Sequence, residues 1–116
     1  MISVIGGTYR EIDYDDISMD IFGSGFRCSK FLLENKCGVV YYTSGNYEVE
    51  RYLKEIKKVY SNFEFQLTKS DDLITFKYSF ALDTPSIFPN ILNIKKTENI
   101  NVSNDNIICY GMLESE

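Results

Sequence analysis

The turn Gly23-Ser24-Gly25 is the segment whose residue types and spacing come closest to a ligand-binding motif. Residues 26–35 follow it with helical periodicity, so the turn would lie at the N-terminus of a helix. Free backbone amides at such a terminus can bind hydroxyl groups or an anion. The turn lacks the third small residue of a dinucleotide fingerprint, because Cys28 stands there, and it lacks the Gly-Lys-Ser/Thr ending of a phosphate loop. A plain tight turn is the alternative, and the spacing alone favours it.

Other reactive residue types are few. The sequence has no histidine, which excludes Ser-His-Asp and Cys-His nucleophilic sites and every histidine-ligated metal. No register of the acidic residues 11–20 fits an EF-hand calcium loop, so they indicate a solvated loop or a poorly buried edge. The three cysteines form no CxxC pair, and an odd number argues against a disulfide framework. They are Cys28, Cys37 and Cys109.

Length and charge exclude further classes. The 116 residues suffice for one domain with a core, and a net charge of −5 argues against a nucleic-acid surface. No apolar run approaches the ~18 residues of a membrane span, and the N-terminus has no signal-peptide pattern. These features predict a single domain over residues 1–116 in the cytoplasm, without nucleic-acid or membrane partners.

The first half of the chain predicts an alternation of strands and helices. Apolar and β-branched runs at residues 2–5 and 38–43 indicate buried strands. Residues 26–35 and 46–60 have helical periodicity, with Ser24 and Asn46 as candidate caps and Asn62 as a left-handed end. Such β-α-β-α order predicts a parallel sheet covered by helices, which binds ligands at the carboxyl ends of its strands.

In the second half of the chain, apolar and polar residues alternate as they do along β-strands. Apolar residues alternate over 63–67 and 74–82, and the second run has one polar face that indicates antiparallel pairing. Residues 87–94 predict a returning strand that Pro89 confines to an edge or a bulge. Residues 107–111 predict a last buried strand. The fold class is therefore α/β, with a partial Rossmann-like parallel sheet and a small antiparallel sheet from strands at about 63–94.

The whole pattern resembles the N-terminal part of the ribokinase-like (PfkB) carbohydrate and nucleoside kinases. Three features carry the resemblance: a strand ending in Gly6-Gly7, the glycine pair opening a helix within residues 22–29, and the later strands, which are similar to that family's lid. The resemblance implies that Glu11 and the turn Gly23-Ser24-Gly25 bind the hydroxyls of a sugar or nucleoside. The family usually has asparagine where Tyr9 stands and aspartate where Glu11 stands.

The resemblance also identifies what this sequence lacks. The family's catalytic aspartate belongs to a GxGD motif in a later half that also holds the nucleotide site, and neither has a counterpart here. ATP and Mg²⁺ would therefore be cofactors only if a C-terminal half completed the protein. The expected function is the substrate-binding and lid portion of such a kinase, incomplete for phosphoryl transfer on its own.

Two other functions remain open at this point. The first is a non-catalytic ribokinase-like module that assembles with itself or with a partner chain through the lid strands. The second is an independent small α/β enzyme, against which stands the absence of any nucleophile-base pair in the sequence.

Overall fold

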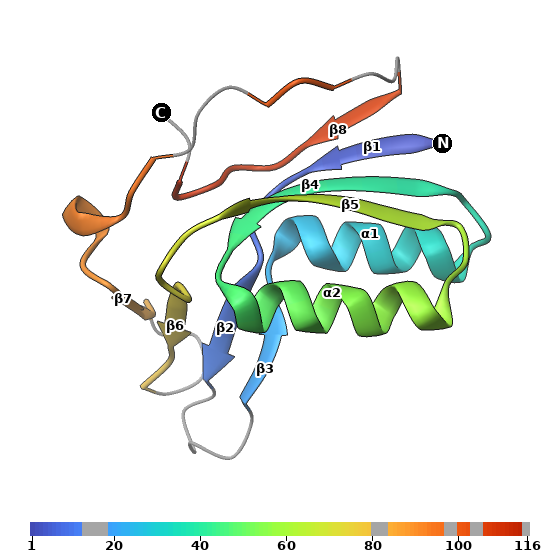
Figure 1. The fold of residues 1–116 in the computed structure, drawn as a ribbon. Helices are drawn as coiled ribbons and strands as arrows, with labels where there is room; N and C mark the ends of the chain where they lie inside the picture. Colours follow the sequence, from blue (N-terminus) through green and yellow to red (C-terminus); the bar gives the residue numbers. More distant parts are fainter. Residues whose placement is uncertain (13–18, 80–83, 97–99, 103–105, 115–116) are drawn as a thin grey trace.

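The computed structural model describes residues 1–12, 19–79, 84–96, 100–102 and 106–114, which form an α/β fold with two helices and two sheets (Figure 1). The elements follow one another in the order β1, β2, β3, α1, β4, α2, β5, β6, β7, η1 and β8. Their bounds are Ile2–Ile5, Tyr9–Ile12, Met19–Phe22, Ser24–Glu34, Val39–Gly45, Tyr47–Val59, Phe63–Lys69, Thr75–Lys77, Ser86–Phe88, Ile91–Asn93 and Ile107–Cys109.

The main sheet is wholly parallel and has the strand order β5-β4-β1-β8. The chain moves outward from β1 to β4 and β5, and then returns to pair β8 with the other side of β1. The strand order therefore reverses between β1 and β8. In open α/β sheets such a reversal creates a crevice at the carboxyl ends of the strands.

Both helices pack against the same face of the main sheet (Figure 1). The core cluster joins Phe26 and Leu33 of α1, and Val49 and Leu53 of α2, to alternate residues of the strands. As the sequence predicts, the Asn46 side chain caps α2, since its Oδ1 accepts hydrogen bonds from the amides of the next turn. The predicted left-handed end at Asn62 is wrong, because α2 ends at Val59 and the C-cap residue Tyr60 is extended.

The second sheet has the order β3-β2-β6-β7 and is mixed, so the predicted antiparallel sheet is wrong in this respect. Strand β6 pairs in parallel with β2 and antiparallel with β7. The sheet also contains residues 9–12 and 19–22, which overlap the stretch 11–20 that the sequence indicates as a loop or a poorly buried edge. Of the range 63–94, β5 belongs to the main sheet instead, and residues 80–82 of the expected strand 74–82 lie outside the described residues.

Two ion pairs connect strand β2 to the two helices. Arg10 Nη2 lies 2.6 Å from Glu48 Oε2 at the start of α2, and Glu11 Oε2 lies 2.8 Å from Arg27 Nη2 in α1. Because these pairs are partly exposed, each contributes little stability, about 0–1 kcal/mol. Together they connect β2 of the second sheet to the two helices that cover the main sheet.

A buried hydroxyl cluster fixes the chain where it leaves β1. Thr8 Oγ1 lies 2.7 Å from the Tyr41 hydroxyl and 2.8 Å from Thr43 Oγ1, both on β4. The Tyr41 hydroxyl also lies 2.9 Å from the carbonyl oxygen of Gly7. All three side chains are almost fully buried. Since buried polar groups are costly without partners, this cluster specifies one path for the turn after β1.

The start of α1 approaches the end of β1 more closely than side chains would allow. A Cβ atom placed on Gly25 would lie 2.6 Å from the Cα atom of Gly6. Gly23 has a φ of 117°, and a Cβ there would collide with the carbonyl oxygen of Gly7. Both glycines of the turn are therefore required by backbone packing, independently of any ligand.

This packing predicts that Gly25→Ala destabilises the protein by about 1–3 kcal/mol, because two backbone segments must move apart. The free energy of unfolding, measured by urea denaturation, checks the prediction. Gly111→Ala is the matched control, since a Cβ at Gly111 meets nothing within 4 Å. Equal stability of the two variants would contradict the proposed role of the close approach.

Candidate functional site

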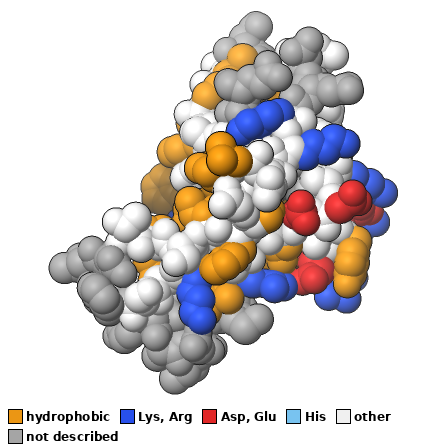
Figure 2. Space-filling view, turned by 90° about the vertical axis from the view of Figure 1, so that its left-hand side faces the viewer, with side chains coloured by type: hydrophobic (Ala, Val, Ile, Leu, Met, Phe, Trp, Pro, Cys, Tyr) orange, Lys and Arg blue, Asp and Glu red, His pale blue; other side chains and the backbone are white. Residues whose placement is uncertain are grey.

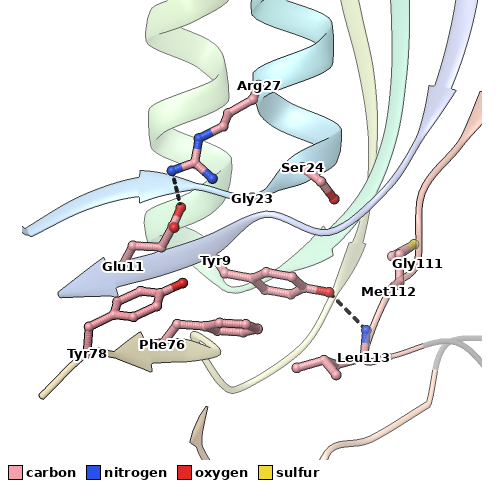
Figure 3. Close-up of a pocket in the computed structure, with 10 residues that line it drawn as sticks. All are labelled: Tyr9, Glu11, Gly23, Ser24, Arg27, Phe76, Tyr78, Gly111, Met112 and Leu113. Carbon is pink, nitrogen blue, oxygen red and sulfur yellow. Dashed lines mark hydrogen bonds and ion pairs between the residues drawn. The ribbon is translucent and has the colours of Figure 1, made fainter. Parts of the chain in front are cut away.

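A cavity of about 450 Å³ opens at the carboxyl end of β1, next to the reversal of strand order. Its volume falls within the ~300–1,000 Å³ typical of small-molecule sites. Segments from four parts of the chain line it: β2, the start of α1, the segment of β6 and Tyr78, and the residues after β8 (Figure 3). Its lining residues are Tyr9, Glu11, Gly23, Ser24, Arg27, Phe76, Tyr78, Gly111, Met112 and Leu113.

Three of the four site residues expected from the sequence line this cavity: Glu11, Gly23 and Ser24. Gly25 does not, because it is buried against Gly6 in the contact between α1 and β1. The expected hydroxyl-binding turn is thus divided between two tasks. Gly23 and Ser24 border the cavity, whereas Gly25 brings the helix close enough to form it.

The N-terminus of α1 presents uncapped backbone to the cavity. Gly23 occupies the N-cap position and supplies no side-chain hydrogen bond, so the expected capping by Ser24 is wrong. Ser24 is instead the first residue of the helix, and its side chain is exposed at the cavity wall (Figure 3). The first amides of a helix have no acceptor within it, and of the first residues of α1 only Ser24 lines the cavity before Arg27.

Glu11 and Arg27 form the charged part of the cavity wall. Glu11 Oε2 lies 2.8 Å from Arg27 Nη2, and the Arg27 guanidinium lies 4.9 Å from the centre of the Phe22 ring (Figure 3). Glu11 Oε2 is buried, with this ion pair and no hydrogen-bond partner. Glu11 therefore belongs to the cavity wall as half of an ion pair, and its carboxylate can accept further hydrogen bonds.

Aromatic rings from the second sheet form the opposite part of the wall. Tyr9 and Phe76 stack with ring centroids 5.1 Å apart and planes 15° apart. Tyr9 is only 7% exposed, and a Cβ at Gly7 would collide with its ring, so that glycine makes room for it. Phe76 and Tyr78 are half-buried and retain ring surface toward the cavity (Figure 3).

The Tyr9 hydroxyl also holds the segment that follows β8. It accepts a hydrogen bond of 2.9 Å from the Leu113 amide and donates one of 3.2 Å to Glu114 Oε2. Lys96 Nζ donates to the Leu113 carbonyl at 2.6 Å. Burial raises the pKa of the Glu114 carboxyl above its ordinary value, because the protein interior disfavours its charged form. Burial likewise raises the pKa of Tyr9, next to that carboxyl.

Sequence reasoning missed most of the apolar side of this cavity. Tyr9 was visible as a departure from the family pattern, but nothing in the spacing places its ring against Phe76. Met112 and Leu113 enter the site only because β8 pairs with β1. The alternation around residue 76 was the one available signal, since it places Phe76 and Tyr78 on one face of a strand.

Within the described part of the chain, no group of three or more Cys, Asp and Glu side chains is placed to hold a metal ion. No helix of that same part has the length and apolar character needed to cross a membrane.

No protein-family model matches this chain, and no curated protein sequence matches it either. The class that fold and site define is thus an α/β protein with a cavity at the reversal of its parallel sheet.

The raised pKa of Glu114 predicts a pH dependence of stability. The folded state holds this proton more tightly than the unfolded state, so its contribution is complete below the ordinary pKa of 4.5. The contribution is lost as the pH rises through the raised value. We therefore expect Glu114→Gln to gain stability relative to the wild type as the pH increases from 4.5 toward neutral.

Melting temperatures of both proteins across that pH interval measure the effect, and glutamine keeps an oxygen to accept the Tyr9 hydrogen bond. Glu34→Gln on the exposed surface of α1 is the control, and its difference from the wild type should not follow this trend. Parallel pH curves for wild type and Glu114→Gln would show that the buried carboxyl does not titrate in this way.

Proposed function

We propose that this chain is the substrate-binding and lid portion of a ribokinase-like, PfkB-like sugar or nucleoside kinase. In this proposal the main sheet is a partial Rossmann-like sheet, and the cavity binds a hydroxylated small molecule. The observation that carries the proposal is the position of the cavity at the carboxyl end of β1, where the strand order reverses between β1 and β8. Ligands of open α/β sheets bind at this place.

The chemistry of the wall supports hydroxyl binding. Glu11 lines the cavity, and its carboxylate, which is paired with Arg27, can accept a further hydrogen bond from a ligand hydroxyl. Ser24, the first residue of α1, presents its hydroxyl at another part of the wall. Acceptor and donor groups on the same wall suit a hydroxylated ligand, since each hydroxyl both donates and accepts.

Phosphoryl transfer requires more than this wall provides. The reaction depends on positioning and on stabilising charge, with a base and metal ions beside the phosphates of ATP. The sequence has no GxGD motif to supply the base and the anion hole. In the proposal, ATP and Mg²⁺ therefore bind only when a C-terminal half completes the protein, and this chain contributes the substrate side.

The first test measures ligand binding to this chain. Sugars and nucleosides are screened by thermal shift, because a ligand that binds only the folded state raises the melting temperature. For a ligand that binds, Glu11→Ala should weaken affinity about tenfold to hundredfold, since it removes a charged hydrogen-bond acceptor worth ~1.5–3 kcal/mol. Isothermal titration calorimetry measures this loss.

Glu34→Ala removes an exposed carboxylate at the other end of α1, outside the cavity wall, and serves as the control, with unchanged affinity expected. If none of the sugars and nucleosides shifts the melting temperature, the cavity is not a site for this class of ligand and the proposal fails.

A second function, assembly through the second sheet, is favoured by exposed apolar side chains at its edge. Phe88 on the edge strand β7 is 55% exposed, and Ile91 and Leu92 in η1 are 49% and 89% exposed. Figure 2, which faces this side of the molecule, shows several separate hydrophobic side chains exposed on it. An exposed strand edge with apolar neighbours is suited to pairing with another chain.

Assembly predicts a mass that rises with protein concentration in light scattering coupled to size-exclusion chromatography. Leu92→Ser should shift the protein toward the monomer, because it removes the most exposed of these side chains from the contact. Val59→Ser is the matched control, since Val59 is 72% exposed on α2, away from β7. A monomer at all concentrations would exclude self-assembly.

A further inference from the structure

The cavity has two chemically unlike sides, and this division restricts its ligand. The rings of Tyr9, Phe76 and Tyr78 lie on one side, from β2 and the β6 segment (Figure 3). Glu11 and Arg27 lie at one end, and Met112 and Leu113 add further apolar surface from the segment after β8. A ligand that fits must have an extended apolar part and a hydroxylated part at one end.

A free sugar matches this division poorly. Its hydroxyl groups are distributed around the whole ring, and each one buried without a partner costs free energy. Apart from Glu11, Arg27, Ser24 and the Tyr78 hydroxyl, the side chains of the wall are rings and apolar groups that offer few hydrogen-bond partners. A flat aromatic ring, in contrast, can contact the partly exposed rings of Phe76 and Tyr78 while losing few hydrogen bonds to water.

The charges at the polar end restrict the ligand further. Glu11 and Arg27 lie 2.8 Å apart and form a pair of zero net charge. A cationic ligand arm near Glu11 would also meet the Arg27 guanidinium, and a phosphate near Arg27 would also meet the Glu11 carboxylate. The Glu11 carboxylate lines the cavity and can accept from a neutral donor without disturbing the charge balance of this pair. The favoured polar arm is an uncharged one with hydroxyl groups.

We propose that the ligand of this cavity is an uncharged compound with a flat heteroaromatic ring and a hydroxylated arm, that is, a nucleoside. The ring lies against the aromatic side of the wall, and an arm hydroxyl donates to Glu11. This inference rests on the proposed function. Of the sugars and nucleosides proposed there, it selects the nucleosides, and it also excludes nucleotides.

The test compares adenosine, uridine, ribose and adenosine monophosphate by isothermal titration calorimetry with the full chain. We expect the two nucleosides to bind at least tenfold more tightly than ribose, since stacking on aromatic side chains contributes substantially for each base. Adenosine should also bind more tightly than its monophosphate. Phe76→Leu should weaken adenosine binding about tenfold and leave any binding of ribose unchanged.

Phe76 also stacks on Tyr9, so its replacement can disturb folding. Tyr78→Leu is the second variant, with the same expected loss, and Tyr78→Phe is its matched control because it keeps the ring and removes only the hydroxyl. Circular dichroism establishes which variants are folded before binding is measured. A folded Tyr78→Leu variant with unchanged adenosine affinity would overturn the role of the aromatic side.

The remaining outcomes separate this inference from the proposed function. If ribose binds as tightly as adenosine, the inference is overturned while hydroxyl binding at the cavity stands. If the monophosphate binds more tightly than adenosine, the selection of uncharged ligands is overturned. If none of the four compounds binds, both the inference and the choice of sugar or nucleoside as ligand are wrong.

Discussion

The contact between the backbones of Gly6 and Gly25 sets the geometry of most of the molecule. It holds the N-terminus of α1 directly over the carboxyl end of β1, and a single Cβ atom on Gly25 would lie 2.6 Å from Gly6 Cα. The cavity exists beside this contact because Gly23 and Ser24 reach its wall only when the helix lies so close. The buried hydroxyl cluster around Thr8 then fixes how the chain leaves β1 toward the second sheet.

Periodicity and capping residues predicted the parts of the fold that local chemistry decides. The stripe of α2 and its Asn46 cap, and the buried strand at residues 2–5, depend on neighbours in the sequence and are confirmed. The second sheet could not be predicted in the same way. Its strand β2 is short and mostly half-buried, and it pairs with residues more than sixty positions away, so long-range packing overrides the loop-like composition around it.

The candidate site also combines residues that the sequence could predict with residues that only long-range packing brings together. Glu11 and the turn at Gly23 were accessible to sequence reasoning because a motif marks them. Tyr9 was not, since its importance comes from three contacts that the fold creates: the ring of Phe76, the space left by Gly7, and the backbone of Leu113. Tyr9 adds an aromatic ring to a part of the wall that spacing in the sequence does not define.

Strand β1 lies at the centre of the main sheet, yet its neighbour β8 comes from residues 107–109, about a hundred positions later. During synthesis on the ribosome, the first strand must therefore remain unpaired on one side until nearly all of these residues have emerged. The late arrival of β8 also brings Met112 and Leu113, so the cavity is among the last features to form. Long-range pairing of this kind slows folding. The wall of the cavity is therefore complete only after residues 107–113 have joined the fold.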